Sequence, residues 1–222
     1  MADINKNLIA VANAFKAFKV QYKKGIDCFT LFENFTDVLD KELKDYQIKY
    51  DYICGKDTLN VDGVTKNYLL ADGDTIIMDI SVGFDGVWCD VTRTFFVGGY
   101  SSNQEQIFNL IKDSLERGKK ALKNGAFALD IYNAVNQAFV EKGKRLIHHA
   151  GHKIGQSCLL QPQFLPDNDG AVYLNDLVAI ESGLYEDFGI RLENDYLITK
   201  DGAVDLFTDL MPLDIKEYVL NE

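Results

Sequence analysis

Five residues in five separate segments have side chains that suit divalent metals: Asp79, Asp90, His152, Glu181 and Glu193. Each offers a hard carboxylate oxygen or an imidazole nitrogen, and together they suit a carboxylate-rich site for two metal ions. Whether the fold brings them together decides between an enzyme and an ordinary acidic globular protein.

The first pair of acids lies in a predicted β-hairpin over residues 75–97. Apolar and polar residues alternate, and Asp85-Gly86 is typical of a two-residue hairpin turn. This turn places Asp79 opposite Thr92 and makes Asp90 its diagonal neighbour, with backbones about 7–8 Å apart. The alternative is that this face of the hairpin is polar because it meets solvent.

The second pair of acids lies in a similar strand pair over residues 177–185 and 190–199. Glu181 follows an apolar strand segment, and Glu193 comes twelve residues later. Each alone reads as a surface glutamate. Their placement mirrors that of Asp79 and Asp90, which indicates a weak internal duplication of a strand-turn-strand unit with an acid on each arm.

The three histidines of the chain gather within five residues, in the segment HHAGHKIG. They are His148, His149 and His152. Gly151 and Gly155 allow close backbone approach and argue against a helix, so a zinc site on one helical face is not expected. The H-E-x-x-H motif of zinc peptidases is absent from the sequence.

The composition favours a globular protein of the cytoplasm. The formal net charge is -11 over 222 residues, which argues against nucleic-acid binding. The sequence shows no apolar run of membrane-spanning length and no secretory signal. Its four scattered cysteines read as free thiols in a reducing compartment.

The remaining pattern predicts one domain over residues 1–222, without an extra N-terminal domain. Helices are expected at 4–22, 30–43, 103–123 and 129–143, and a short strand at 50–54. A loop is expected around Pro162 and Pro166. Residues 203–222 are expected to form a loop with one or two helical turns.

Four segments resemble the pita-bread metallopeptidases, the family of methionine aminopeptidase, aminopeptidase P, prolidase and creatinase. In order, they are GDTIIMDISVGFDGVWCDVTRTFFVGG, HHAGHKIG, ESGLY and GIRLENDYLIT. The resemblance runs from about residue 8 to 205. It implies an α+β fold, with a pseudo-twofold antiparallel sheet covered by helices.

The resemblance also implies a role for each of the five residues. Asp79 would hold one metal, His152 and Glu181 the other, and Asp90 and Glu193 would bridge both. The metals would be manganese, cobalt, iron or zinc. Such cations lower the pKa of a water and polarise a scissile carbonyl, which suits hydrolysis.

Catalysis and substrate binding involve two further residues under this resemblance. Glu181 would act as proton shuttle as well as ligand, and His148 would be catalytic and near the substrate. Arg191 occupies a position where proline-specific members carry arginine, which favours the Xaa-Pro peptidase branch. A surface salt bridge is the alternative for Arg191. The expected partner is a peptide or small amide, and a homodimer is left open.

Two family histidines are replaced in this chain. Leu159 stands at one of their positions, and the stretch 60–63, with Asp62, stands at the other. Family histidines there orient substrate and stabilise the tetrahedral intermediate. Leu159 and Asp62 are therefore expected to belong to a remodelled substrate-binding surface.

Three functions remain open from the sequence. The first is a metal-dependent exopeptidase that cleaves Xaa-Pro bonds, because the five ligands are present. The second is a catalytically silent binding or regulatory module on the same fold, because the histidines are replaced. The third is a non-peptide metallohydrolase or lyase with a remodelled pocket.

Overall fold

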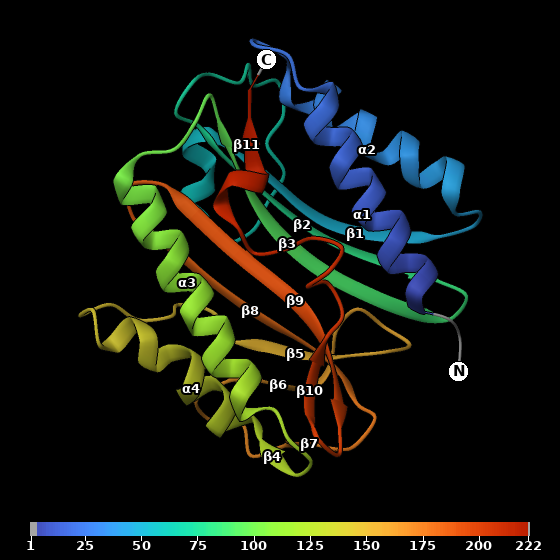
Figure 1. The fold of residues 1–222 in the computed structure, drawn as a ribbon, viewed down its shortest axis with the longest axis vertical. Coiled ribbons are helices and arrows are strands. Elements are labelled where there is room, and N and C mark those ends of the chain that lie inside the picture. Colours follow the sequence, from blue (N-terminus) through green and yellow to red (C-terminus); the bar gives the residue numbers. More distant parts are fainter. Residues whose placement is uncertain (1–3, 222) are drawn as a thin grey trace.

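The computed structural model describes residues 4–221 and is built around two main β-sheets that are covered by helices (Figure 1). Helices α1 (Ile4–Gln21) and α2 (Cys28–Glu42) lie beside the first sheet. Helices α3 (Ser102–Ala121) and α4 (Ala128–Val140) lie beside the second. Residues 1–3 and 222, which belong to the predicted domain over residues 1–222, lie outside the described residues.

The first sheet contains the predicted hairpin. Its order is β1–β2–β3–β11, and its strands are β1 (Gln47–Cys54), β2 (Thr75–Phe84), β3 (Val87–Val97) and β11 (Val219–Leu220). Asp85 and Gly86 both have positive φ, at 51° and 78°, as a type I′ turn requires. Asp79 pairs with Thr92, so the predicted register is confirmed.

The second sheet contains the other predicted hairpin. Its order is β10–β9–β8–β5–β6, and its strands are β5 (Gly151–Ile154), β6 (Leu160–Gln163), β8 (Leu177–Tyr185), β9 (Gly189–Thr199) and β10 (Gly202–Asp205). Here Glu181 and Glu193 pair directly. A separate two-stranded sheet joins β4 (Ala126–Phe127) to β7 (Ala171–Val172).

Helix ends are set by local sequence. Asp27 caps α2 by accepting hydrogen bonds from the backbone N–H groups of Phe29 and Thr30. Ser101 and Gln104 form a capping box at the start of α3. These caps satisfy backbone N–H groups in the first turn and mark where each helix begins.

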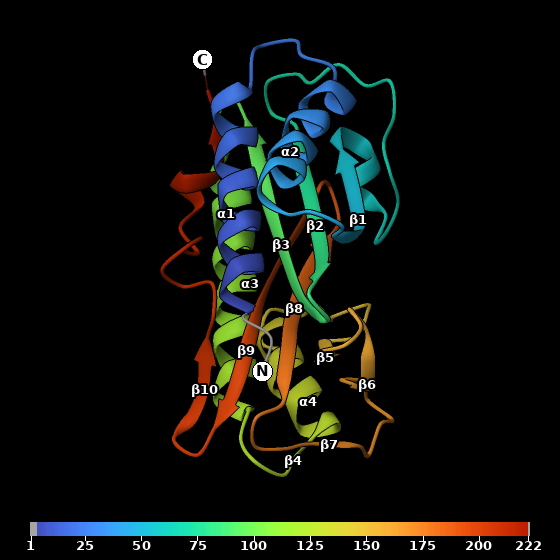
Figure 2. The same ribbon diagram turned by 90° about the vertical axis from the view of Figure 1, so that its right-hand side faces the viewer.

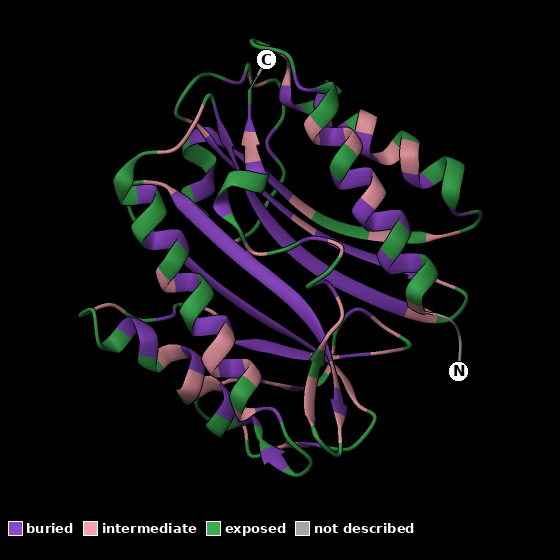
Figure 3. Cartoon of the chain, viewed as in Figure 1, coloured by how far each residue is buried: buried purple, intermediate pink, exposed green. Residues whose placement is uncertain are grey.

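Alternation in the strands separates an apolar face from a polar face. In β2, Met78 and Ile80 belong to the same core cluster as Phe15 and Phe18 of α1. Asp79 and Ser81 therefore face away from the helices. The long strands β2, β3, β8 and β9 are buried along most of their length, while the outer faces of the helices are exposed (Figure 3).

Some short strands differ from the sequence prediction. The loop expected around Pro162 contains β6, and the tail expected as loop and helical turn contains β10 and β11 as well as the short 3-10 helix Ile215–Tyr218. These strands are two to four residues long, and each is defined by pairing with a strand distant in sequence or across a turn, which local periodicity does not reveal. The strand predicted at 50–54 begins three residues earlier, at Gln47.

The two sheets meet along a seam where β3 and β9 lie side by side (Figures 1 and 2). Side chains, rather than a backbone ladder, join them. Thr94 exchanges hydrogen bonds with the backbone of Arg191, at 2.9 and 3.0 Å. Thr92 Oγ1 donates to Glu193 Oε2 at 2.7 Å, and the Asp90 N–H donates to Asp195 Oδ2 at 2.9 Å.

Buried Arg93 reinforces the seam. Its guanidinium donates to the backbone carbonyl of Glu193 at 2.7 Å and to Asn194 Oδ1 at 2.7 Å. It also donates to Met211 O at 2.7 Å and Tyr218 Oη at 2.9 Å. Arg93 therefore fixes β9 and the C-terminal segment against β3.

Candidate metal centre

Two rows of side chains cross both sheets and build the candidate site. Strand pairing and the seam align the first row as Asp51, Asp79, Thr92, Glu193 and Glu181. The second row is Lys49, Ser81, Asp90, Asp195, Ala179 and His152. Within each sheet, neighbouring strands lie about 4.8 Å apart, so residues next to each other in a row have side chains in reach. At the seam, the hydrogen bonds Thr92–Glu193 and Asp90–Asp195 connect the two parts of each row.

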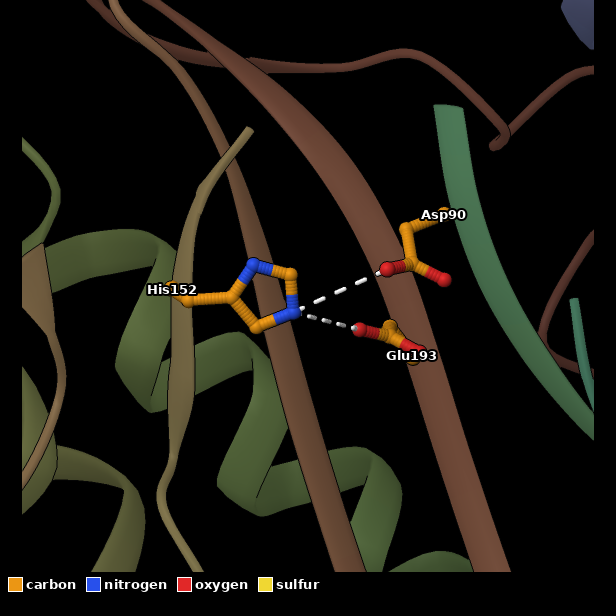
Figure 4. A group of neighbouring side chains, drawn as sticks. All are labelled: Asp90, His152 and Glu193. Carbon is orange, nitrogen blue, oxygen red and sulfur yellow. Dashed lines mark ion pairs between the residues drawn. The ribbon is translucent and has the colours of Figure 1, made fainter. Parts of the chain in front are cut away.

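One group of potential ligands joins three strands (Figure 4). His152 Nε2 lies 3.6 Å from Asp90 Oδ2 and 3.9 Å from Glu193 Oε1. The three side chains come from β5, β3 and β9 and point toward one another. All three are buried, so solvent screens their interaction weakly.

A second group contains Asp79, Glu181 and Glu193. In each group one ligand atom per residue lies within 4.8 Å of the others, and Glu193 belongs to both groups. The resemblance pairs Glu181 with His152, whereas here the Glu181 carboxylate groups with Asp79. Glu181 and Asp79 stand in the first row of side chains and His152 in the second, which accounts for this placement.

The carboxylates of the site strain one another electrostatically. Burial, followed by the charge of Asp79, raises the pKa of Asp90 well above its ordinary value. Burial and the charge of Asp90 do the same to the pKa of Glu193. Burial also raises the pKa of Asp79 to about 6, with nearby Glu181 adding to the rise and Arg191 opposing it.

A cation would relieve this repulsion. Glu193 Oε1 is buried and has no hydrogen-bond partner within the described residues. An uncompensated buried carboxylate oxygen is costly, and a divalent cation is a partner that also favours the charged form. The donor set of carboxylates with one imidazole therefore fits manganese, cobalt, iron or zinc.

Glu181 differs from the other three carboxylates. Burial acts to raise its pKa, but His148 and His149 outweigh burial and the net pKa is lowered. Its Oε1 lies 3.0 Å from His148 Nδ1 and 3.3 Å from His149 Nδ1. Burial lowers the pKa of His152, which favours the neutral form that a metal requires.

The structure distinguishes the two neighbouring histidines. His148 lies behind Glu181, with Nε2 3.3 Å from the hydroxyl of Tyr185 and Nδ1 2.7 Å from the backbone carbonyl of His149. His149, which the sequence analysis did not assign, lines the cavity over the site. The spacing of the HHAGHKIG motif could not show which histidine lines the cavity, because His148 and His149 are adjacent in sequence. In the structure both rings lie next to Glu181.

Arg191 is held by protein groups. Its Nη2 lies 2.8 Å from Asp79 Oδ2 and 3.3 Å from Asp51 Oδ2, and its Nη1 donates to Val61 O at 2.6 Å. Asp51 Oδ1 also accepts from the backbone N–H of Gly63, at 3.0 Å. Arg191 is 2% exposed, so it connects the site to the loop 60–63 rather than lying at its surface.

The positions of the two replaced histidines differ in the structure. Leu159 is 46% exposed and lines the cavity over the carboxylates. Asp62 is exposed and lies outside the residues that line this cavity. The cavity has a volume of about 230 Å³.

Besides His149, sequence reasoning missed Lys49 and Asp51 among the charged residues at this cavity. Both belong to β1, whose start was predicted after Lys49. The signal was the alternation of Lys49, Asp51 and Ile53 across an edge strand. None of the helices within residues 4–221 has the length and apolar character needed to cross a bilayer.

Comparison with known proteins identifies related chains. The model of metallopeptidase family M24 matches residues 2–200. An uncharacterized peptidase of Methanocaldococcus jannaschii is 31% identical over 151 residues, which are 65% of this chain and 42% of that protein. A Xaa-Pro dipeptidase of Pyrococcus furiosus is 26% identical over 145 residues, 64% of this chain and 42% of its own.

Solved structures share the fold. The prolidase from Pyrococcus furiosus matches with a TM-score of 0.85 and 22% identity over 91% of this chain and 62% of that chain. An X-Pro aminopeptidase from Thermotoga maritima has a TM-score of 0.85 and 23% identity over 96% of this chain and 61% of that chain. The predicted α+β, pita-bread fold is confirmed. The chain spans about four tenths of the length of the curated relatives named above.

Proposed function

Because the chain belongs to metallopeptidase family M24, we propose that it is a metal-dependent hydrolase of short peptides, of the Xaa-Pro dipeptidase or aminopeptidase type. The single observation that carries the proposal is the convergence of four carboxylates and His152 on one buried site. The relative from Pyrococcus furiosus, described as a Xaa-Pro dipeptidase, supports the substrate class.

The five residues Asp79, Asp90, His152, Glu181 and Glu193 would hold two divalent cations. When bound, such cations polarise a scissile carbonyl and make a water molecule more acidic. The protein provides a buried pocket in which these effects are stronger than in bulk water. Glu193 belongs to both ligand groups, which favours a bridging position for it.

Proton transfer would rest on Glu181. Its carboxylate stays ionised because His148 and His149 lie beside it, so it can accept a proton from the attacking water. His148, held between Glu181 and Tyr185, would orient this carboxylate. Arg191 would position Asp79 through its ion pair rather than contact substrate.

The test is metal analysis combined with a peptide panel. Protein loaded with manganese, cobalt, iron or zinc is assayed on Xaa-Pro and Met-Xaa peptides beside an active control enzyme. We expect two metals per chain and turnover of Xaa-Pro peptides, lost in Glu181→Gln and kept in Glu33→Gln, which changes an exposed glutamate. Metal binding without hydrolysis of any peptide would overturn the proposal.

One observation favours a second function, a catalytically silent binding module. Leu159 puts a half-exposed aliphatic side chain on the cavity wall, and Asp62 does not line it. No imidazole therefore occupies either replaced position. Peptide binding by calorimetry, without turnover under any metal, would support this second function over the first.

A further inference from the structure

Lys49 is a cation at the edge of the candidate site that the proposed chemistry does not use. It pairs with Ser81, which in turn pairs with Asp90, so it stands in the same row as Asp90 and His152. With strands about 4.8 Å apart, its backbone lies about 10 Å from that of Asp90. A lysine side chain can cover much of this distance, and Lys49 lines the cavity.

The charge of Lys49 is not neutralised by the protein. Within residues 4–221, Lys49 takes part in no ion pair, although Asp51 is two positions along the same strand. Asp51 is instead engaged by Arg191 and by Gly63 N–H. Lys49 is exposed, so its ammonium is available to a bound molecule.

No other lysine or arginine among the described residues lines this cavity. The rest of its charged wall consists of two histidines and five acids, four of which are proposed metal ligands, so Lys49 is the one fixed cationic side chain on the described wall. Arg191 is not on the wall, and both of its terminal nitrogens have protein partners. A carboxylate entering the cavity would therefore be drawn to Lys49.

The size of the cavity limits the substrate. About 230 Å³ is below the range of roughly 300–1,000 Å³ typical of sites for drug-sized ligands. One extended residue spans about 3.5 Å, so in a dipeptide the terminal carboxylate lies one residue from the scissile amide. A longer peptide would carry its carboxylate past the row that contains Lys49.

We propose that Lys49 binds the free C-terminal carboxylate of a dipeptide and so determines specificity for dipeptides over longer or amidated peptides. The inference rests on the proposed function, because it takes the carboxylate groups of the site as the place of amide hydrolysis. Lys49 takes no part in the hydrolytic step. It binds the C-terminal carboxylate of the substrate by charge and hydrogen bonding.

The experiment compares three probes on metal-loaded protein: alanyl-proline, alanyl-prolinamide, and glutamyl-prolinamide, which carries its carboxylate on a side chain. Steady-state kinetics are measured where the protein turns a probe over, and calorimetric dissociation constants where it does not. The variants are Lys49→Gln, Lys49→Arg as the conservative rescue, and Lys200→Gln as the matched control in the exposed turn after β9.

We expect Lys49→Gln to raise KM or Kd for alanyl-proline by about tenfold to a hundredfold, the range for a hydrogen bond to a charged group. Its kcat should stay within about threefold, and alanyl-prolinamide should be unaffected. Lys49→Arg should restore most of the affinity, and Lys200→Gln should change nothing.

Other outcomes overturn the inference or separate it from the proposed function. An equal loss on the acid and the amide would show a structural role for Lys49. A loss confined to glutamyl-prolinamide would assign Lys49 to side-chain carboxylates instead. Carboxylate-dependent binding that is lost in Lys49→Gln, without turnover in any protein, would support Lys49 while overturning the hydrolase.

Discussion

The two acid-bearing hairpins place their two acids on one face of the sheet in different ways. In β2–β3, a two-residue turn leaves Asp79 opposite Thr92, so Asp79 and Asp90 are diagonal neighbours. In β8–β9, the loop is one residue longer, the acids are one residue further apart in sequence, and Glu181 and Glu193 lie directly opposite. Loop length and acid spacing change together, so in both hairpins the acids share the polar face.

The strands that flank the hairpins also differ. β1, beside β2, brings Lys49 and Asp51 to the cavity, while β5, beside β8, brings His152. The half with Asp79 and Asp90 therefore contributes a free cation, and the half with the glutamates contributes the imidazole. Both halves therefore contribute proposed metal ligands, and the half with Asp79 and Asp90 adds a cation suited to a carboxylate.

Glu193→Gln is expected to have the largest effect, because Glu193 belongs to both ligand groups while Asp79 belongs to one. We expect kcat/KM to fall by about a thousandfold or more, with metal content reduced at both positions. Asp79→Asn should retain more metal. Metal analysis and steady-state kinetics measure these losses, with Glu33→Gln as control. Full metal content in Glu193→Gln would contradict a larger role in metal binding for Glu193 than for Asp79.

Arg191→Met tests the ion pair between Arg191 of β9 and Asp79 of β2, which joins the two hairpins. Removal of the guanidinium leaves the carboxylate of Asp79 without its ion-pair partner and Val61 O without its donor. We expect a loss of about 3–5 kcal/mol in unfolding free energy. Urea titration measures it against Arg145→Met at an exposed position. A loss below about 1 kcal/mol would contradict a positioning role.

Gly151→Ala tests the strand that carries His152. Gly151 has φ of 132°, and an added Cβ would collide with the backbone carbonyl of Ala179. Strain and overpacking together should cost about 2–4 kcal/mol. Gly86→Ala is the matched control, because its φ is also positive but nothing lies within 4 Å of the added Cβ. Thermal unfolding should show a cost of about 1 kcal/mol there; equal costs would contradict the tight β5–β8 packing.

A pH dependence in metal-free protein is expected to be the smallest effect. Burial raises the folded-state pKa of Asp79 to about 6, above its usual 3.8. The folded state therefore takes up a proton first, and stability attributable to Asp79 rises as pH falls from 7 toward 5.

The difference in unfolding free energy between wild type and Asp79→Asn reports Asp79 together with its effect on Asp90 and Glu193, whose pKa values its charge raises. The contribution of His152, whose lowered pKa acts in the opposite direction, is present in both proteins. We expect the difference to shift in favour of wild type by about 1–2 kcal/mol between pH 7 and pH 5. Asp62→Asn serves as the matched control. A difference that does not vary with pH would show that Asp79 is not strained in the metal-free site.

Much of the frame could be predicted from the sequence because it is local. The Asp85-Gly86 turn defines the register of β2–β3 without reference to the rest of the chain. The apolar alternation likewise separates Met78 and Ile80 from Asp79. The helices agree with their amphipathic pattern to within about three residues at each end.

What could not be predicted depends on contacts between distant segments. No local pattern reveals that Thr92 would donate to Glu193 across the seam, or that Arg191 would reach Asp79. His149 and His148 are indistinguishable until the chain direction through residues 148–151 is known. β6 and β10 are too short for periodicity to identify, and each is defined by its partner strand.

The seam has a consequence for folding. Each hairpin joins residues close in sequence, whereas the seam bonds join residues 97 to 105 positions apart and do so through side chains. Short-range hairpins close at lower entropic cost, so we expect each half to form before the halves dock. Asp90 and Glu193 stand on opposite sides of the seam, so the two halves must dock before both can bind one metal. The rate of metal uptake during refolding would therefore measure the rate of this last step of folding.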